Sequence, residues 1–101
     1  MSDLDLPPHS RKAVGVRLQI TRQALKLSPG EFATKAGIAK NTYSQYESGD
    51  RLPALEFAIK LCERFELTLD WVFRGDPSGL KYNLAEEIIR LRHAGNTPKK
   101  K

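Results

Sequence analysis

Cysteine, histidine and long apolar runs are scarce in this chain of 101 residues, and each scarcity excludes a class of protein. The single cysteine, Cys62, cannot close a disulfide within the chain, and the two histidines do not lie at the spacing of a zinc site. No apolar run approaches the roughly 18 residues that a membrane-spanning helix needs. The N-terminus lacks the basic and apolar regions of a secretion signal. We therefore expect a cytoplasmic protein without metal, cofactor or membrane contact.

Catalytic signatures are also missing from the sequence. It has no glycine-rich phosphate loop, no set of nucleophile, histidine and acid, and no clustered carboxylates at ligand spacing. We predict that the protein is not an enzyme. The formal net charge of +5 suits a polyanionic partner, but a charge of this size is also common in proteins that bind none.

Apolar residues recur at intervals of three and four, and no segment shows the strict alternation of a half-buried strand. This periodicity predicts an all-α fold. The predicted helices cover residues 13–25, 29–36, 40–47, 55–65, 69–73 and 84–93. On the fourth of these, the spacing of the apolar residues predicts one core-facing stripe: Leu55, Ala58, Ile59, Cys62 and Phe65.

Local signals support several of the predicted helix ends. Ser28 and Glu31 have the spacing of a capping box, with Pro29 at the first helical position. Gly37 and Gly49 can adopt the left-handed conformation in which helices often end. The second and third helices are therefore predicted to be short and sharply bounded.

Two further caps are predicted nearer the C-terminus. Thr68 is expected to cap the short fifth helix, and Asn83 and Glu86 have capping-box spacing at the start of the last one. Between these helices, residues 75–79 form a break rich in turn-forming residues.

The second and third helices carry the most informative pattern. Small Ala33 lies where the two helices must cross closely, Gly37 provides a tight turn, and Ile38 fills the corner behind it. Tyr43 and Tyr46 provide the inward side of the third helix. This is the helix-turn-helix arrangement.

These motifs resemble the repressor-type (XRE-like) helix-turn-helix proteins, which include the DNA-binding domains of the lambdoid phage repressors and Cro. The likeness covers roughly residues 14–75 in a five-helix order. Its carriers lie in the first helix, around the turn and late in the domain: Arg17-Leu18, Arg22, Leu27-Ser28, Phe32 to Ile38, Tyr46 to Gly49 and Leu69-Asp70-Trp71. The resemblance implies a five-helix repressor-like DNA-binding domain, to which this chain adds one C-terminal helix.

The third helix has a polar outward arc. At about 100° per residue, four polar side chains share this arc, opposite the tyrosines: Lys40, Asn41, Ser44 and Gln45. Glutamine and asparagine can pair with adenine, and lysine can donate to guanine, so the arc suits the edges of DNA bases. Any surface helix carries a polar face, and it is the turn motif that favours base reading here. The resemblance likewise implies base-reading roles for Lys40, Asn41 and Gln45.

Other polar residues are candidates for contacts with DNA phosphates, which position a protein without reading sequence. The candidates are Arg51 first, then Ser28, Ser48, Arg11 and Lys12. For Arg11 and Lys12, as for the lysines at 99–101, simple solubilising charge is an equal alternative.

The resemblance also implies a structural ion pair between Arg22 and Glu47, which would brace the first helix against the third. The alternative is two unpaired surface charges.

The chain divides into four predicted parts. Residues 1–12 are expected to be a flexible arm, 13–75 the helix-turn-helix DNA-binding domain, 76–95 a C-terminal extension containing a helix, and 96–101 a basic flexible tail.

One such module contacts little DNA, so we expect a homodimer on a pseudo-palindromic site, with recognition helices about 34 Å apart. The candidate interface residues are Trp71, Phe73, Tyr82, Leu84 and Ile88. In an equal alternative, the last helix folds back over the core, and Trp71 and Phe73 are buried within one subunit.

The sequence thus predicts a regulator, expected to be a repressor, that binds double-stranded DNA sequence-specifically. Two alternatives remain open: an antitoxin-type regulator that also binds a toxin protein, and a protein-interaction module that no longer binds DNA. Acidic Asp50 near the phosphate track favours the latter, as does Pro29 where many family members carry glutamine. Lys40 and Gln45 argue against it.

Overall fold

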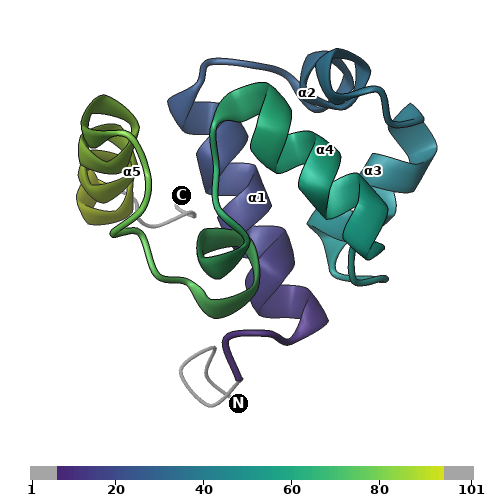
Figure 1. The fold of residues 1–101 in the computed structure, drawn as a ribbon, viewed down its shortest axis with the longest axis horizontal. Helices are drawn as coiled ribbons and strands as arrows, with labels where there is room; N and C mark the ends of the chain where they lie inside the picture. The colour runs from purple at the N-terminus through teal and green to yellow at the C-terminus, as the bar shows by residue number, and fades with distance from the viewer. Residues whose placement is uncertain (1–6, 95–101) are drawn as a thin grey trace.

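The computed structural model describes residues 7–94, and this part of the chain is all-helical, as predicted. Residues 1–6 of the predicted arm and the predicted basic tail at 96–101 lie outside the described residues. The helices are α1 (Arg11–Ala24), α2 (Pro29–Ala36), α3 (Lys40–Ser48), α4 (Leu55–Phe65), the π-helix η2 (Asp70–Arg74) and α5 (Tyr82–Ala94). Figure 1 shows α1 in the middle of the molecule, with α5 on one side and α2, α3 and α4 on the other.

Helix α1 begins two residues earlier than expected. The hydroxyl of Ser10 accepts a hydrogen bond from the backbone N–H of Ala13 at 3.2 Å, and this N-cap starts the helix at Arg11. Arg11 and Lys12, which we predicted to belong to the flexible arm, therefore lie in the first turn of α1.

Helices α2 and α3 have the predicted boundaries to within a residue. The Ser28 hydroxyl accepts from the N–H of Glu31, and the Glu31 carboxylate accepts from the N–H of Ser28, which completes the predicted capping box. Gly37 and Gly49 close the two helices with φ angles of 76° and 86°, in the left-handed region. Ile38 is buried in the corner between them.

The core is built around large side chains from every helix. The ring of Phe32 stacks on that of Phe65 at 4.4 Å and meets the edge of Tyr43 at 5.3 Å. Trp71 is 1% exposed, and its indole N–H donates to the hydroxyl of Thr21 at 2.8 Å. This hydrogen bond explains how a threonine can lie on the buried side of α1.

The predicted core-facing stripe of α4 is wrong at two positions. Leu55 is 62% exposed and Ile59 39% exposed, whereas Ala58 and Leu61 are fully buried. Helix α4 packs against α2, and the ring centroid of its Phe57 lies 6.5 Å from that of Tyr46 in α3. The buried face of α4 is therefore centred on Ala58 and Leu61. The periodicity predicted the helix correctly, but it placed Leu55 and Ile59 on the buried face, where the structure has Leu61.

The C-terminal helix also differs from the prediction. Helix α5 begins at Tyr82, so Asn83 lies inside it and cannot cap it. Thr68 does accept a hydrogen bond from the N–H of Trp71, at 2.9 Å, at the start of η2. Helix α5 packs along α1, and Ile88 belongs to the same core as α1 to α4. The described part of the C-terminal extension thus completes the core of the helix-turn-helix domain.

This packing corrects the candidate dimer interface. Trp71 and Ile88 are each 1% exposed within a single chain, so both side chains pack in the core of that chain. Phe73 and Leu84 are partly buried against the core, and only Tyr82, 75% exposed, faces solvent. The arrangement is the alternative in which the last helix folds back over the core.

Candidate nucleic-acid interface

The third helix is held against α1 by direct backbone contact at Gly15. A Cβ atom at this position would lie 2.5 Å from the carbonyl oxygen of Glu47 and 2.8 Å from that of Tyr46. Only glycine allows α1 and α3 to approach this closely. Gly15 was not among the predicted site residues, although a glycine inside an otherwise helical pattern is a recognised sign of close packing.

A bidentate ion pair joins the same two helices. The guanidinium of Arg22 donates to both carboxylate oxygens of Glu47 at 2.8 Å, and the hydroxyl of Tyr43 donates to the same carboxylate at 2.7 Å. The side chains of Arg22 and Glu47 are 14% and 15% exposed. The hydrogen bond to Glu47 raises the pKa of Arg22, and burial raises the pKa of Tyr43, so the guanidinium stays charged and the phenol neutral. The pair implied by the resemblance is therefore formed.

With its inner side fixed in this way, α3 turns the predicted polar arc outward. Lys40, Asn41 and Ser44 are exposed and Gln45 is half-buried, whereas Tyr43 and Tyr46 are fully buried. The stem of Lys40 crosses Gly30, where a Cβ would lie 3.4 Å from the Lys40 Cε. The structure thus brings the four predicted base-reading residues together on one face.

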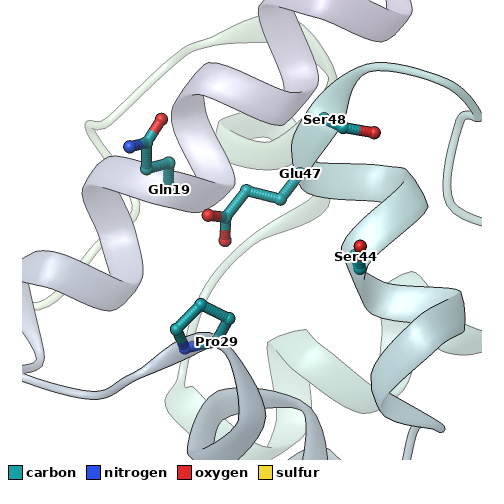
Figure 2. Close-up of a pocket in the computed structure, with 5 residues that line it drawn as sticks. All are labelled: Gln19, Pro29, Ser44, Glu47 and Ser48. Atoms are coloured by element: carbon teal, nitrogen blue, oxygen red, sulfur yellow. The ribbon is translucent and has the colours of Figure 1, made fainter.

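A shallow groove borders this face. It has a volume of about 340 Å³ and is lined by Gln19, Pro29, Ser44, Glu47 and Ser48 (Figure 2). Figure 2 shows Glu47 pointing from α3 into the space between α1 and the start of α2. Pro29 offers neither a backbone N–H nor a side-chain amide here. Gln19, one helical turn after Gly15, was not among the predicted site residues.

The predicted phosphate contacts fall into two groups. The hydroxyls of Ser28 and Ser48 already serve local hydrogen bonds, the first with the N–H of Glu31 and the second with the carbonyl oxygen of Gln45 at 3.2 Å. Both side chains remain exposed.

The cationic candidates gather at the C-terminal end of α3. Arg11 donates to the carbonyl oxygen of Asp50 at 3.4 Å, and the stem of Lys12 packs over Gly49. Arg51 donates to the side-chain oxygen of Gln45 at 2.9 Å. These three exposed cations lie near the end of α3, where Asp50 adds one exposed carboxylate, so this edge of the helix carries more positive than negative charge.

Neither a metal site nor a membrane span is found in the described residues. Residues 7–94 hold no cluster of three or more histidine, cysteine, aspartate or glutamate side chains placed to bind a metal ion. Within the same residues, no helix has the length and apolarity needed to cross a bilayer.

Comparison with known proteins identifies the family. Residues 18–72 match the family model described as helix-turn-helix. The chain is 33% identical over 54 residues to the cryptic phage CTXphi transcriptional repressor RstR of Vibrio cholerae, covering 54% of this chain and 48% of that protein. It is 32% identical over 74 residues to the uncharacterized HTH-type transcriptional regulator YobD of Bacillus subtilis, covering 69% and 66%.

The chain thus spans about half of the first relative and 66% of the second. A search of the solved structures gave no significant match. The matched segment contains all of α2, α3 and α4, the Arg22–Glu47 pair and the outward arc of α3. The chain belongs to the repressor-type, XRE-like helix-turn-helix family.

Proposed function

We propose that this protein is a transcription regulator, acting as a repressor, that binds double-stranded DNA sequence-specifically through α3. The observation that carries the proposal is the outward arc of Lys40, Asn41, Ser44 and Gln45, on a helix whose opposite side is fixed to α1 by backbone contact and an ion pair. A rigid helix with exposed polar side chains can enter the major groove. The repressor assignment draws on the name of the Vibrio cholerae relative.

Each side chain of the arc has a distinct use in the major groove. The ammonium of Lys40 donates to guanine O6 and N7, and the amides of Asn41 and Gln45 both offer N–H donors to acceptor atoms of the bases. The Ser44 hydroxyl both donates and accepts, so it discriminates least. We therefore assign most of the sequence preference to Lys40, Asn41 and Gln45.

Cations beside the arc supply the contacts that do not depend on sequence. Arg11 and Lys12 lie at the start of α1, next to the end of α3, where they can neutralise phosphates on one flank of the groove. On the other flank, the N-terminus of α2 with Ser28 is a further anion-binding position. Asp50 opposes this binding, which lowers the expected affinity without changing its site.

Dimer formation then needs a surface other than Trp71 and Ile88. We assign it to the exposed apolar pair Leu55 and Ile59, one turn apart on α4, with a second copy of this chain as the occupant. Glu56 and Lys60 follow Leu55 and Ile59 on the same side of α4, so an antiparallel pairing of two α4 helices would bring these opposite charges near each other.

The assignment is tested by selecting duplexes from a random pool and measuring affinity for the winning sequence. Lys40→Ala and Asn41→Ala are each expected to cost about 1–3 kcal/mol on that duplex and to relax its preference. Lys81→Ala is the matched control, because it removes the same charge on the α5 side of the molecule, where Lys81 pairs with Glu66. Equal affinity of the wild type and both α3 variants for the selected duplex would refute base reading by this arc.

Two further measurements test the competing function and the dimer. A complete lack of salt-dependent duplex binding would leave a protein-interaction module as the remaining function. Mass measurement in the same buffer tests the dimer, since Leu55→Asp is expected to give a monomer while Lys81→Ala does not.

A further inference from the structure

A glutamine on a recognition helix can face the bases with either its acceptor oxygen or its donor nitrogen, because its amide can rotate about the Cγ–Cδ bond. In this structure the Gln45 amide has a partner that distinguishes the two ends. The Nη1 of Arg51 donates to the Gln45 Oε1 at 2.9 Å. With the amide reversed, two donor groups would face each other and this hydrogen bond would be lost.

The backbone holds Arg51 beside Gln45. After α3 ends at Gly49, the chain turns back, and the N–H groups of Asp50 and Arg51 both donate to the carbonyl oxygen of Gln45, at 2.9 and 3.1 Å. The two side chains therefore start from backbone positions that are already hydrogen-bonded to each other. This reduces the conformational freedom that usually weakens an exposed side-chain contact.

The guanidinium of Arg51 also lies over an aromatic ring of the core. Its Cζ lies 5.9 Å from the ring centroid of Tyr46, which is fully buried in the core. Contact with an aromatic face attracts an arginine and restricts its plane. Arg51 is thus held by the Gln45 backbone, the Gln45 side chain and the Tyr46 ring.

We propose that Arg51 is a positioning residue that sets the base preference of Gln45. This proposal rests on DNA binding through α3, as proposed above. Arg51 holds the amide oxygen, which directs the two Nε2 N–H donors to the remaining side, where the bases lie. Gln45 then selects acceptor atoms, namely guanine O6 and N7, adenine N7 and thymine O4. It disfavours a cytosine amino group, which would oppose donor to donor.

A phosphate contact by Arg51 is the competing role, and the two roles predict different measurements. A phosphate contact contributes equally to every sequence and to the salt dependence of binding. A positioning role acts only through Gln45, and only at the base pair that Gln45 reads. A double-mutant cycle between the two residues separates these cases.

The test uses Arg51→Met, Gln45→Ala and the double variant, with Arg90→Met as the control. Arg90 is an exposed arginine on α5 that pairs with Glu87, so its loss removes the same charge away from α3. Affinities are measured at several salt concentrations for the duplex selected from a random pool. The base pair that Gln45 reads is identified as the one at which Gln45→Ala no longer discriminates. Affinities are measured also for the three duplexes that carry each of the other base pairs at this position.

The wild type is expected to bind the duplex that presents a cytosine amino group to Gln45 on the order of 5- to 150-fold more weakly than the selected duplex. Arg51→Met is expected to remove most of that discrimination, to leave the salt slope unchanged, and to have no further effect on discrimination when combined with Gln45→Ala. A uniform loss of affinity on all four duplexes, with the slope smaller by about 0.9 and discrimination intact, would overturn the proposal and make Arg51 a phosphate contact.

A measurement on the free protein makes the outcome independent of DNA binding. The side-chain amide of Gln45 is expected to have a higher NMR order parameter in the wild type and in Arg90→Met than in Arg51→Met. Equal order parameters in all three would overturn the positioning role. If no duplex is bound by any variant, the proposed function fails, and the order parameter still decides whether Arg51 holds the amide.

Discussion

Removing Arg22 should destabilise the domain substantially, because it leaves Glu47 with an uncompensated charge between α1 and α3. In Arg22→Met, the carboxylate loses two charge-assisted hydrogen bonds of 2.8 Å and keeps only the Tyr43 hydroxyl. Breaking a fully buried pair costs about 3–5 kcal/mol, and an exposed pair is worth about 0–1 kcal/mol. With side chains 14% and 15% exposed, this pair lies nearer the buried limit. We expect a loss of about 2–3 kcal/mol in the free energy of unfolding.

Urea unfolding followed by circular dichroism measures this loss. For a slope of about 1–3 kcal/mol per molar urea, a loss of about 2–3 kcal/mol should lower the midpoint by about 0.7–3 M. Arg90→Met is the matched control, since its pair with Glu87 is exposed, and its midpoint should hardly move. Combining Arg22→Met with Glu47→Leu should recover part of the loss, because no unpaired charge then remains between the helices.

Two results would show that the unpaired charge of Glu47 is not what destabilises Arg22→Met. One is a loss for Arg22→Met no larger than that of Arg90→Met. The other is a double variant whose loss equals the sum of the losses in Arg22→Met and Glu47→Leu, which would show that the two residues act independently.

Three further predictions concern the packing around α1 and α4. Gly15→Ala should lower thermal stability, because overpacking against the Glu47 carbonyl costs about 1–3 kcal/mol and outweighs a helix-propensity gain of at most about 1 kcal/mol; an unchanged melting temperature would contradict the close approach. Thr21→Val should cost about 1–3 kcal/mol in urea unfolding by leaving the Trp71 indole N–H unpaired, and a neutral result would mean that the hydrogen bond is not formed. Burial raises the pKa of the Cys62 thiol to about 11, so a smaller fraction of the thiol is ionised at pH 8. Alkylation of Cys62 by iodoacetamide should therefore be about 100-fold slower than that of free cysteine, and its rate should increase as the pH approaches that pKa. Reaction at the rate of free cysteine would contradict the burial.

The sequence predicted best what is decided locally. Ser28, Glu31, Gly37 and Gly49 act within a few residues of their own position, through a hydrogen bond to a nearby N–H or a left-handed turn, so the ends of α2 and α3 could be read directly. The outward arc followed from these ends, because once a short helix is bounded and its tyrosines point inward, the opposite face is determined.

Long-range packing decided the features that were missed. The phase of α4 depends on which side meets α2, and Leu55 and Ile59 are as apolar as the residues that are buried in their place. Nothing near Arg17 in the chain indicates that its guanidinium donates to the carbonyl oxygen of Val72, at 3.2 and 2.9 Å. Gly15 likewise acquires its role only from the backbone of α3.

Helix α3 has one side anchored to the core and one side exposed to solvent, and this division affects how the protein can evolve. The side chains at 43, 46 and 47 hold the helix in place, whereas those at 40, 41 and 44 are exposed. Replacing the exposed set therefore costs little folding free energy. Under the DNA-reading role proposed for these positions, a lineage that carries this domain can acquire a new target while its scaffold stays the same, and transplanting those few positions between relatives should transfer the sequence preference.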